Sequence, residues 1–235
     1  MDILMPLLLA HLLGDFVFQP TSWVQHKIEN LHRSKYLYYH LGIHALLSLL
    51  AFQFQMRFLA ALGIIIVSHG LIDWLKLKWH KKAPELLLFF GDQLAHISII
   101  IAVAHWEAPK QIAFHPFELL TQYTPLLVAL VLLTFGSSIV IQKLMAIWSF
   151  ADEQKSDALP GAGRYIGMLE RLFVFGFMLL QQWQAIGWLI TAKSILRYSD
   201  LSRSKDRKLT EYVLIGTLLS IGLAMLITLS FQQFG

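Results

Sequence analysis

The stretch Ser68-His-Gly-Leu-Ile-Asp-Trp-Leu-Lys76 closes a long apolar run that begins near Phe58. Within it His69 and Asp73 stand four residues apart, so on a helix they share one face, one turn apart. An ionisable side chain in a membrane helix costs about 2.5 to 3.5 kcal/mol on insertion scales, so it usually faces a partner, a cavity or a ligand inside a bundle. The pair therefore predicts a membrane helix that contributes to a buried polar site.

The composition is typical of a polytopic membrane protein. Of 235 residues, 56% are hydrophobic and only 14% are charged, which is too apolar for a soluble domain. A spanning helix needs about 20 mainly apolar residues. We therefore predict an all-α fold, a polytopic transmembrane bundle of about eight spans. The apolar runs cover residues 3–19, 36–55, 58–79, 86–106, 123–147, 164–182, 184–198 and 210–231.

The sixth and seventh runs are short and are separated only by a polar break around Gln182, so they also fit one broken span or a re-entrant pair. The chain has no cysteine, which excludes disulfides and thiolate metal sites. Any transition-metal site must therefore use His and carboxylate ligands. The formal charge of +4 is small and gives no support for a nucleic-acid partner.

Lysine and arginine residues gather after the first, third, fifth and seventh runs. The alternate connections hold little beyond Arg57 and Lys110. By the positive-inside rule, the odd-to-even connections are cytoplasmic, which places both termini outside.

The spacing of His69 and Asp73 recurs in three other apolar runs. At 1.5 Å per residue, the predicted topology places all four pairs within about 6 to 15 Å of the cytoplasmic boundary. Scattered polar pairs would rarely share one depth, so we expect one common site in a four-helix core. The other three pairs are His11 with Asp15, His40 with His44, and Asp92 with His96.

The pairs also suggest an internal duplication. His11-Leu-Leu-Gly-Asp15 resembles the His69–Asp73 segment, and His40-Leu-Gly-Ile-His44 resembles Asp92-Gln-Leu-Ala-His96. Two parallel hairpins related by a pseudo-twofold axis would bring the pairs together. We therefore divide the chain into a four-helix core, residues 1–106, and a C-terminal part, residues 107–235, with a basic cluster on its cytoplasmic side.

The four pairs supply up to eight nitrogen and oxygen ligands, enough for two metals. Imidazole with carboxylate suits zinc, our first choice, and also manganese, iron or nickel. A metal-free proton relay or a polar packing network is the alternative, and nothing in the sequence selects haem. We predict Asp15 and Asp73 as catalytic carboxylates. The predicted metal ligands are His11, His40, His44, His69, Asp73, Asp92 and His96.

Gln19 and Gln93 lie near the pairs and either orient a ligand or substrate or are interfacial polar residues. The C-terminal part holds a second polar set. It fits internal ion pairing with snorkelling side chains, or an anion-binding cradle beside the Gly-containing loop before residue 164. The residues predicted for that cradle are Arg164, Arg171, Lys193 and Arg197.

Several of these segments resemble a bacterial membrane family that is described only as a domain of unknown function, of the DUF3307 type. The resemblance implies a polytopic inner-membrane protein and brings no established activity. The spacing of His and Asp is also similar in its chemistry to membrane-bound zinc hydrolases of lipids, such as the alkaline ceramidases, although the number and order of the pairs differ. The segments are residues 11–16, 40–44, 68–73, 91–96, 163–171 and 192–197.

Three functions compete at this stage. The leading expectation is a membrane-embedded, metal-dependent hydrolase of a lipid or lipid-phosphate near the cytoplasmic interface, since a bound metal activates water and polarises a phosphoryl or acyl oxygen. A transporter of divalent cations or protons is the first alternative. The second is a structural or regulatory membrane component with a structural metal. The outer halves of the first four runs are almost wholly apolar, which disfavours the transporter.

Overall fold

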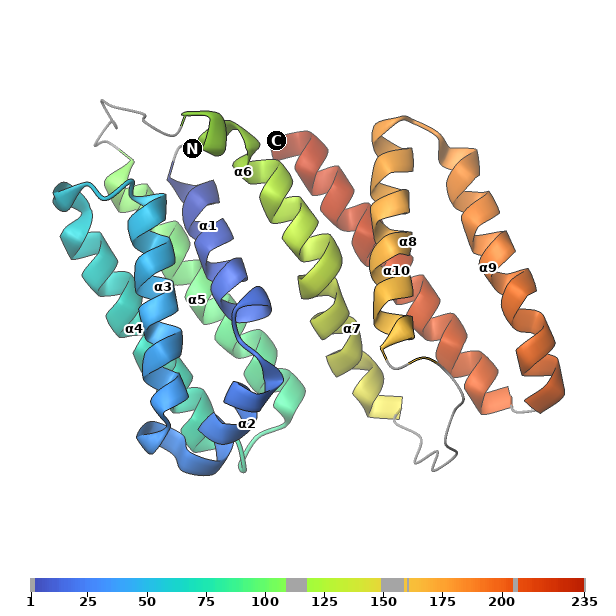
Figure 1. Ribbon diagram of the computed structural model, residues 1–235, viewed down its shortest axis with the longest axis horizontal. Coiled ribbons are helices and arrows are strands. Elements are labelled where there is room, and N and C mark those ends of the chain that lie inside the picture. Colours follow the sequence, from blue (N-terminus) through green and yellow to red (C-terminus); the bar gives the residue numbers. More distant parts are fainter. Residues whose placement is uncertain (1–2, 109–117, 149–158, 160, 205–206, 235) are drawn as a thin grey trace. The chain divides into compact units, whose positions relative to one another are not determined.

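The computed structural model describes residues 3–108, 118–148, 159, 161–204 and 207–234, and every regular element in these residues is a helix. The predicted all-α class is confirmed. The chain divides into two compact units, Met1–Val128 and Ala129–Gly235 (Figure 1). The division predicted from sequence between residues 106 and 107 stays a prediction.

Unit 1 is built on α1 with its continuation η1 and on α3, α4 and α5, and helix α2 connects α1–η1 to α3 (Figure 1). Helix α1 continues without a break into a π-helical turn, η1, and α6 leads from unit 1 into unit 2. The bounds are α1 Leu4–Leu12, η1 Leu13–Val17, α2 Thr21–Asn30, α3 Lys35–Ala51, α4 Leu59–Trp79, α5 Glu85–Glu107 and α6 Glu118–Val131.

A proline separates α1 from α2. Pro20 directly precedes Thr21, the first residue of α2, and the residue before a proline disfavours the helical conformation. The helix axis turns by 81° between the segments Leu4–Val17 and Thr21–Arg33. As a result α2 leaves the line of α1 and packs against α3.

At the level of the four pairs, the helices of unit 1 have polar residues inside and apolar residues outside. On α4 the buried stripe includes His69 and Asp73, whereas Ile64, Val67 and Leu71 are exposed. This pattern is the reverse of a soluble helix and suits a helix that faces lipid.

Four helical segments are long and apolar enough to cross a membrane, or five if the bent segment containing α1 and α2 is one span. All eight predicted runs are helical, but the count of about eight spans is not confirmed. Helix α3 has 17 residues, about 25 Å, which is shorter than the about 30 Å hydrocarbon core. The four segments are Met56–Trp79, Glu85–Glu107, Gln122–Trp148 and Arg207–Gln233.

Unit 2 begins within the fifth run, at Ala129, and contains the helices of the sixth, seventh and eighth runs. The sixth and seventh runs form separate helices, α8 and α9, which a tight turn joins and which pack side by side. Helix α8 carries Arg164, Glu170 and Arg171 within 18 residues, which makes it too charged to count among the candidate spans. The bounds are η4, a π-helical turn, Leu132–Gly136, α7 Ser137–Met145, α8 Ala162–Leu179, α9 Trp183–Ser204 and α10 Arg207–Phe234.

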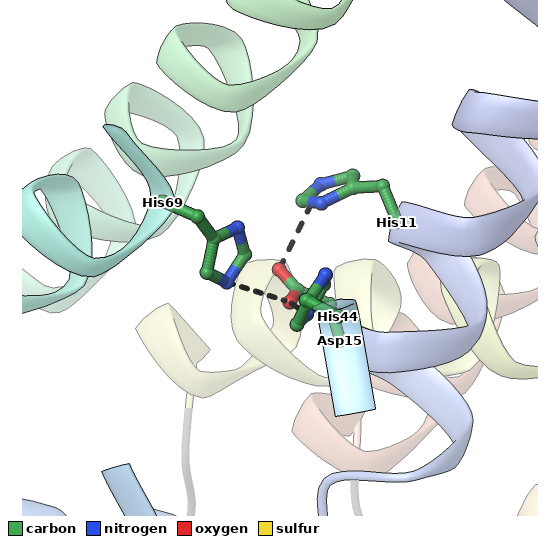
Figure 2. Close-up of side chains that lie close together, drawn as sticks. All are labelled: His11, Asp15, His44 and His69. Carbon is green, nitrogen blue, oxygen red and sulfur yellow. Dashed lines mark hydrogen bonds and ion pairs between the residues drawn. The ribbon is translucent and has the colours of Figure 1, made fainter. Parts of the chain in front are cut away.

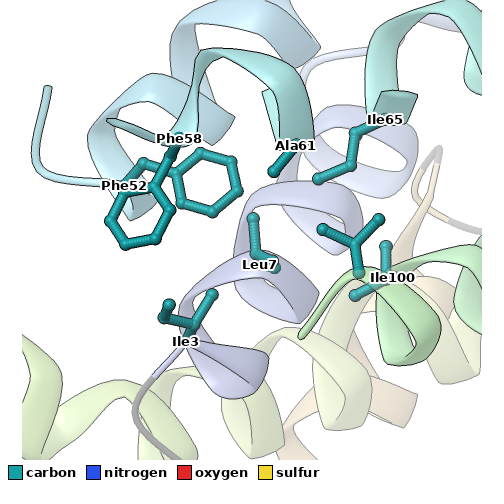
Figure 3. Packing of buried hydrophobic residues seen from close by; sticks show 8 residues of the cluster. Ile3, Leu7, Phe52, Phe58, Ala61, Ile65 and Ile100 are labelled. Carbon is teal, nitrogen blue, oxygen red and sulfur yellow. The ribbon is translucent and has the colours of Figure 1, made fainter. Parts of the chain in front are cut away.

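One end of unit 1 is filled by apolar side chains from α1, α4, α5 and the segment that follows α3 (Figure 3). The rings of Phe52 and Phe58 stack at 4.9 Å between centroids, and each is 1% exposed. We call this group the apolar cluster. It consists of Ile3, Leu7, Phe52, Phe58, Ala61, Ile65, Ile100 and Val103.

Replacing Phe58 by alanine should destabilise unit 1 by about 2 kcal/mol. The same substitution in the core of a soluble protein typically costs about 3 to 5 kcal/mol. The loss is smaller here because, when the helices separate, the phenylalanine ring would face lipid rather than water. Thermal unfolding in detergent measures the change. Met56→Ala, at a position that is 76% exposed, is the matched control and should unfold like the wild type. Equal unfolding of the two variants would contradict the packing role of Phe58.

Candidate metal centre

A π-helical turn at the end of α1 positions Asp15. The Phe18 N–H donates to the Leu13 carbonyl oxygen at 2.9 Å, which is the i to i+5 bond of a π-helix. Gly14 lies in the same turn, and a Cβ atom there would overlap the ring of His44 on α3. The glycine thus allows α3 to approach this turn closely, which brings Asp15 against His44.

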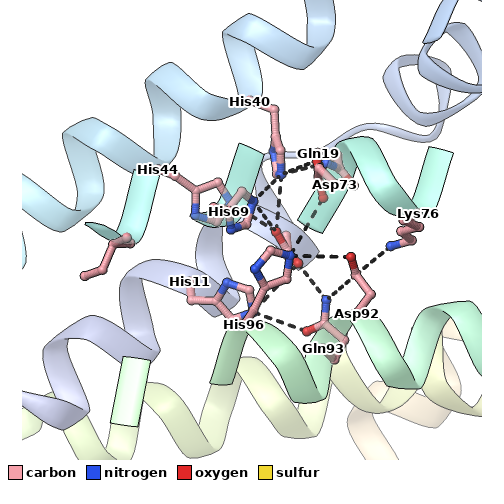
Figure 4. A network of polar contacts seen from close by, with 12 residues as sticks. His11, Gln19, His40, His44, His69, Asp73, Lys76, Asp92, Gln93 and His96 are labelled. Carbon is pink, nitrogen blue, oxygen red and sulfur yellow. Dashed lines mark hydrogen bonds and ion pairs between the residues drawn. The ribbon is translucent and has the colours of Figure 1, made fainter. Parts of the chain in front are cut away.

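Polar side chains from α1–η1, α3, α4 and α5 meet inside unit 1 (Figure 4). The members of all four predicted pairs lie in this group, and every imidazole directs its Nε2 atom towards a carboxylate oxygen at 3.0 to 3.8 Å. All are buried except Asp15, which is nearly so, with a side chain that is 9% exposed. We call this group the polar cluster. It consists of His11, Asp15, His40, His44, His69, Asp73, Asp92 and His96.

Asp15 stands at the centre of the polar cluster (Figure 2). Its Oδ1 atom accepts a hydrogen bond from His44 Nε2 at 3.0 Å and lies 3.8 Å from His69 Nε2. Its Oδ2 atom lies 3.8 Å from His11 Nε2. One ligand atom from each of these four residues lies within 4.8 Å of the other three. Two ligands on one tetrahedral zinc ion lie about 3.3 Å apart, so this set fits a metal with little adjustment.

The other two carboxylates are paired with lysines. Lys27 reaches in from α2 and donates to Asp73 Oδ2 at 3.0 Å, and both side chains are buried. Lys76 donates to Asp92 Oδ2 at 2.6 Å and is partly exposed. No lysine or arginine of the described residues lies within ion-pair distance of Asp15. Asp15 is therefore the carboxylate whose charge a metal would balance.

Two further groups have metal-ligand spacing. In one of them His40 Nε2 lies 3.1 Å from His69 Nε2 and 3.7 Å from Asp73 Oδ2, so this group includes the carboxylate that Lys27 already neutralises. The other group combines Asp92 and His96 with Asp15.

Two glutamines hold the polar cluster in place. The Gln93 amide N–H donates to Asp15 Oδ2 at 2.7 Å, and its carbonyl oxygen lies 3.3 Å from His11 Nε2. The Gln19 amide donates to His40 Nε2 at 3.0 Å. Of the two sequence interpretations, orientation of the polar residues is therefore the one that fits both glutamines.

A cavity of about 10 Å³ lies beside the polar cluster, which is about the volume that one water molecule needs. Imidazoles line one part of it and apolar side chains line another. The imidazoles that line the cavity include His11, His44, His69 and His96, and its apolar lining includes Leu7 and Ile65.

A family model described as "Protein of unknown function (DUF3307)" matches residues 3–121, which is half of the chain and includes the whole polar cluster. The chain belongs to this family. No curated protein and no solved structure matches it. The DUF3307 match ends before the residues predicted to form an anion cradle.

In this DUF3307 protein, Arg171 is buried and its guanidinium is bound within unit 2. Its Nε donates to the Leu133 carbonyl oxygen, its Nη1 to Ser220 Oγ at 3.0 Å, and its Nη2 to Ser138 Oγ at 2.7 Å and to the Thr134 carbonyl oxygen at 3.2 Å. These donors tie α8 to the π-helical turn η4 and to α10, so Arg171 is engaged in internal contacts.

Of the other three predicted cradle residues, Lys193 and Arg164 have described side chains, and each has a contact of its own. Lys193 donates to Glu170 at 2.7 Å. Arg164 is exposed, with its guanidinium 5.8 Å from the centre of the Phe135 ring. Arg197 belongs to α9, and its side chain lies outside the described residues. The internal contacts of Arg171 and Lys193 favour the ion-pairing interpretation of this set.

Lys27 and Lys76 were missed as members of the site, because the charge pattern assigns them to cytoplasmic connections. Lys76 had a detectable signal, since it follows Asp73 by three residues and so lies on the same helical face. Lys27 had none, because its own helix, α2, carries no member of the four pairs.

Replacing Lys27 by methionine should destabilise the DUF3307 protein by about 3 kcal/mol, because it leaves the buried Asp73 carboxylate unpaired. Thermal unfolding in detergent measures the loss. The double variant Lys27→Met/Asp73→Asn should recover most of it, and Lys81→Met, at an exposed position, is the control. Wild-type stability of the single variant would contradict a structural role for the ion pair.

Proposed function

We propose that this DUF3307 protein is a membrane-embedded, metal-dependent hydrolase that acts on a lipid or lipid-phosphate. The observation that carries the proposal is the convergence of three imidazoles on the Asp15 carboxylate beside a cavity of one-water size. The proposed ligands are His11, Asp15, His44 and His69, and zinc is the first choice because imidazole-rich sets suit it.

A divalent metal held by these residues would activate a water at neutral pH and polarise the oxygen of the scissile group. The cavity supplies a place for that water among the imidazoles of His11, His44 and His69. Asp73 Oδ1, the oxygen that Lys27 does not bind, faces the polar cluster 3.8 Å from His96 Nε2. Asp73 is therefore our candidate to accept the water proton, and Asp15 serves as metal ligand.

The charges of the site favour an anionic substrate. Three carboxylates against two ammonium groups leave one negative charge, and a divalent metal would turn this into one positive charge. A phosphate ester would neutralise that charge in surroundings where an unbalanced charge is costly. Lys76 is partly exposed and binds Asp92, a member of the polar cluster, so it is our candidate cation for contact with the head group.

We further propose, from the positive-inside rule, that the polar cluster lies on the cytoplasmic side of an inner membrane and that both termini lie outside. Reporter fusions after Lys35 and Lys81 should report the cytoplasm, and a fusion at Arg57 should report the outer side. Opposite locations for Lys35 and Lys81 would contradict the shared cytoplasmic site.

Transport is disfavoured because the apolar cluster packs the bundle on the far side of the polar cluster, where an ion would need polar contacts. Metal-loaded protein in detergent should hydrolyse phospholipid or polyprenyl phosphate, and proteoliposomes should not accumulate zinc or manganese under a gradient. His69→Ala should lose bound metal and at least about 100-fold in rate, because a metal ligand is removed.

The control for this experiment is His105→Ala, since His105 is exposed on the same helix as His96. It should keep both metal and activity. Saturable metal uptake that disappears in Asp73→Asn would reverse the proposal in favour of a transporter. Bound metal with neither hydrolysis nor uptake would leave the structural role as the better description.

A further inference from the structure

Three buried side-chain atoms of the polar cluster have no hydrogen-bond partner among the described residues: His40 Nδ1, Asp92 Oδ1 and His96 Nε2. The last two come from neighbouring turns of α5, in residues that are 5% and 3% exposed. These two atoms lie 3.4 Å apart. This distance is close to the about 3.3 Å between two ligands of one tetrahedral metal ion. Buried polar atoms are normally satisfied, so the pair calls for a ligand.

The geometry points to a second divalent cation held by Asp92 and His96, with Asp15 as a carboxylate that bridges it to the first. One ligand atom from each of these three residues lies within 4.8 Å of the other two. Asp15 is also the central residue of the first ligand set. The inference rests on the proposed function through this shared carboxylate and extends it from one metal to two.

Gln93 marks the place where the two sites meet. Its amide nitrogen lies 2.7 Å from Asp15 Oδ2 and 3.3 Å from Asp92 Oδ2, so a single N–H₂ group lies between two carboxylates. Two like charges this close repel each other unless a positive group lies nearby. Lys76 meets this need at Asp92 Oδ2, whereas Asp92 Oδ1 lies 3.4 Å from His96 Nε2 and has no hydrogen-bond partner among the described residues.

The two proposed ligand sets differ in the chemical hardness of their donor atoms. The first has three imidazoles and one carboxylate, whereas the second has one imidazole and two carboxylates, a combination that suits Mn²⁺ better. Two metals about 3.5 to 4 Å apart stabilise both the attacking and the leaving oxygen in phosphoryl transfer. A second cation would therefore narrow the substrate of the proposed hydrolase to a phosphate ester.

The test is the metal stoichiometry of full-length protein in detergent, after loading with Mn²⁺ alone. Wild type and the control His105→Ala should each bind two equivalents by elemental analysis. Their electron paramagnetic resonance spectra should show an exchange-coupled pair of Mn²⁺ ions. Asp92→Asn should bind one equivalent with an uncoupled spectrum, and Asp15→Asn should lose the coupling and lower the affinity of both sites.

An uncoupled one-equivalent spectrum in the wild type would overturn the second site without any variant, so a failure of Asp92→Asn to fold cannot hide the result. Two coupled ions that persist in Asp92→Asn would overturn the assignment of the ligand. The proposed hydrolase is tested by a separate measurement, the hydrolysis of phosphate esters. Two bound metals without hydrolysis of any phosphate ester would refute that function and leave the dinuclear centre in place.

Discussion

Unit 1 depends on the burial of charged side chains among apolar helices. Each carboxylate of the polar cluster contacts imidazoles, and two of them also hold a lysine. An unpaired charge in such a place would cost several kcal/mol, so every member needs the others. The arrangement therefore fixes which faces of α1, α3, α4 and α5 turn inward. Apolar packing alone would specify those faces only weakly, because lipid accepts the same side chains.

Much of the polar cluster was predictable because helical periodicity is a local property. Residues four apart share a helical face in any helix, so pairs such as His69 and Asp73 are visible in one sequence. Their meeting in space followed from their common depth. The contact between Lys27 and Asp73 was not predictable, because a long lysine side chain can extend to solvent or fold inward, and the charge count is the same in both cases. The π-helical turn that places Asp15 leaves no comparable signal.

Hydropathy located every run as a helix, and four or five of the helical segments have the length and composition of a membrane span. An apolar run in the sequence does not show what surrounds the helix that it forms. A helix that packs against other helices can be shorter or more polar than a helix that faces lipid on all sides. Helix α3, with 17 residues, is an example of a short helix, and α8, with its buried Arg171, is an example of a more polar one.

The two units also share one backbone feature, a π-helical turn. In each unit a π-helical turn lies at a charged side chain: η1 presents Asp15, and η4 offers carbonyl oxygens to Arg171.

The order of the two clusters along α1 bears on what the site can do. Ile3 and Leu7 belong to the apolar cluster, and His11 and Asp15 follow one and two turns later in the polar cluster. The one-water cavity lies where the two meet, lined by Leu7 and Ile65 as well as by imidazoles. An ion that left the imidazoles in this direction would lose its ligands and gain only hydrocarbon, so a cation bound as we propose would be retained. A metal-dependent hydrolase requires that its metal ion stay bound next to a space for water. A metal transporter must instead release the ion on the other side of the membrane.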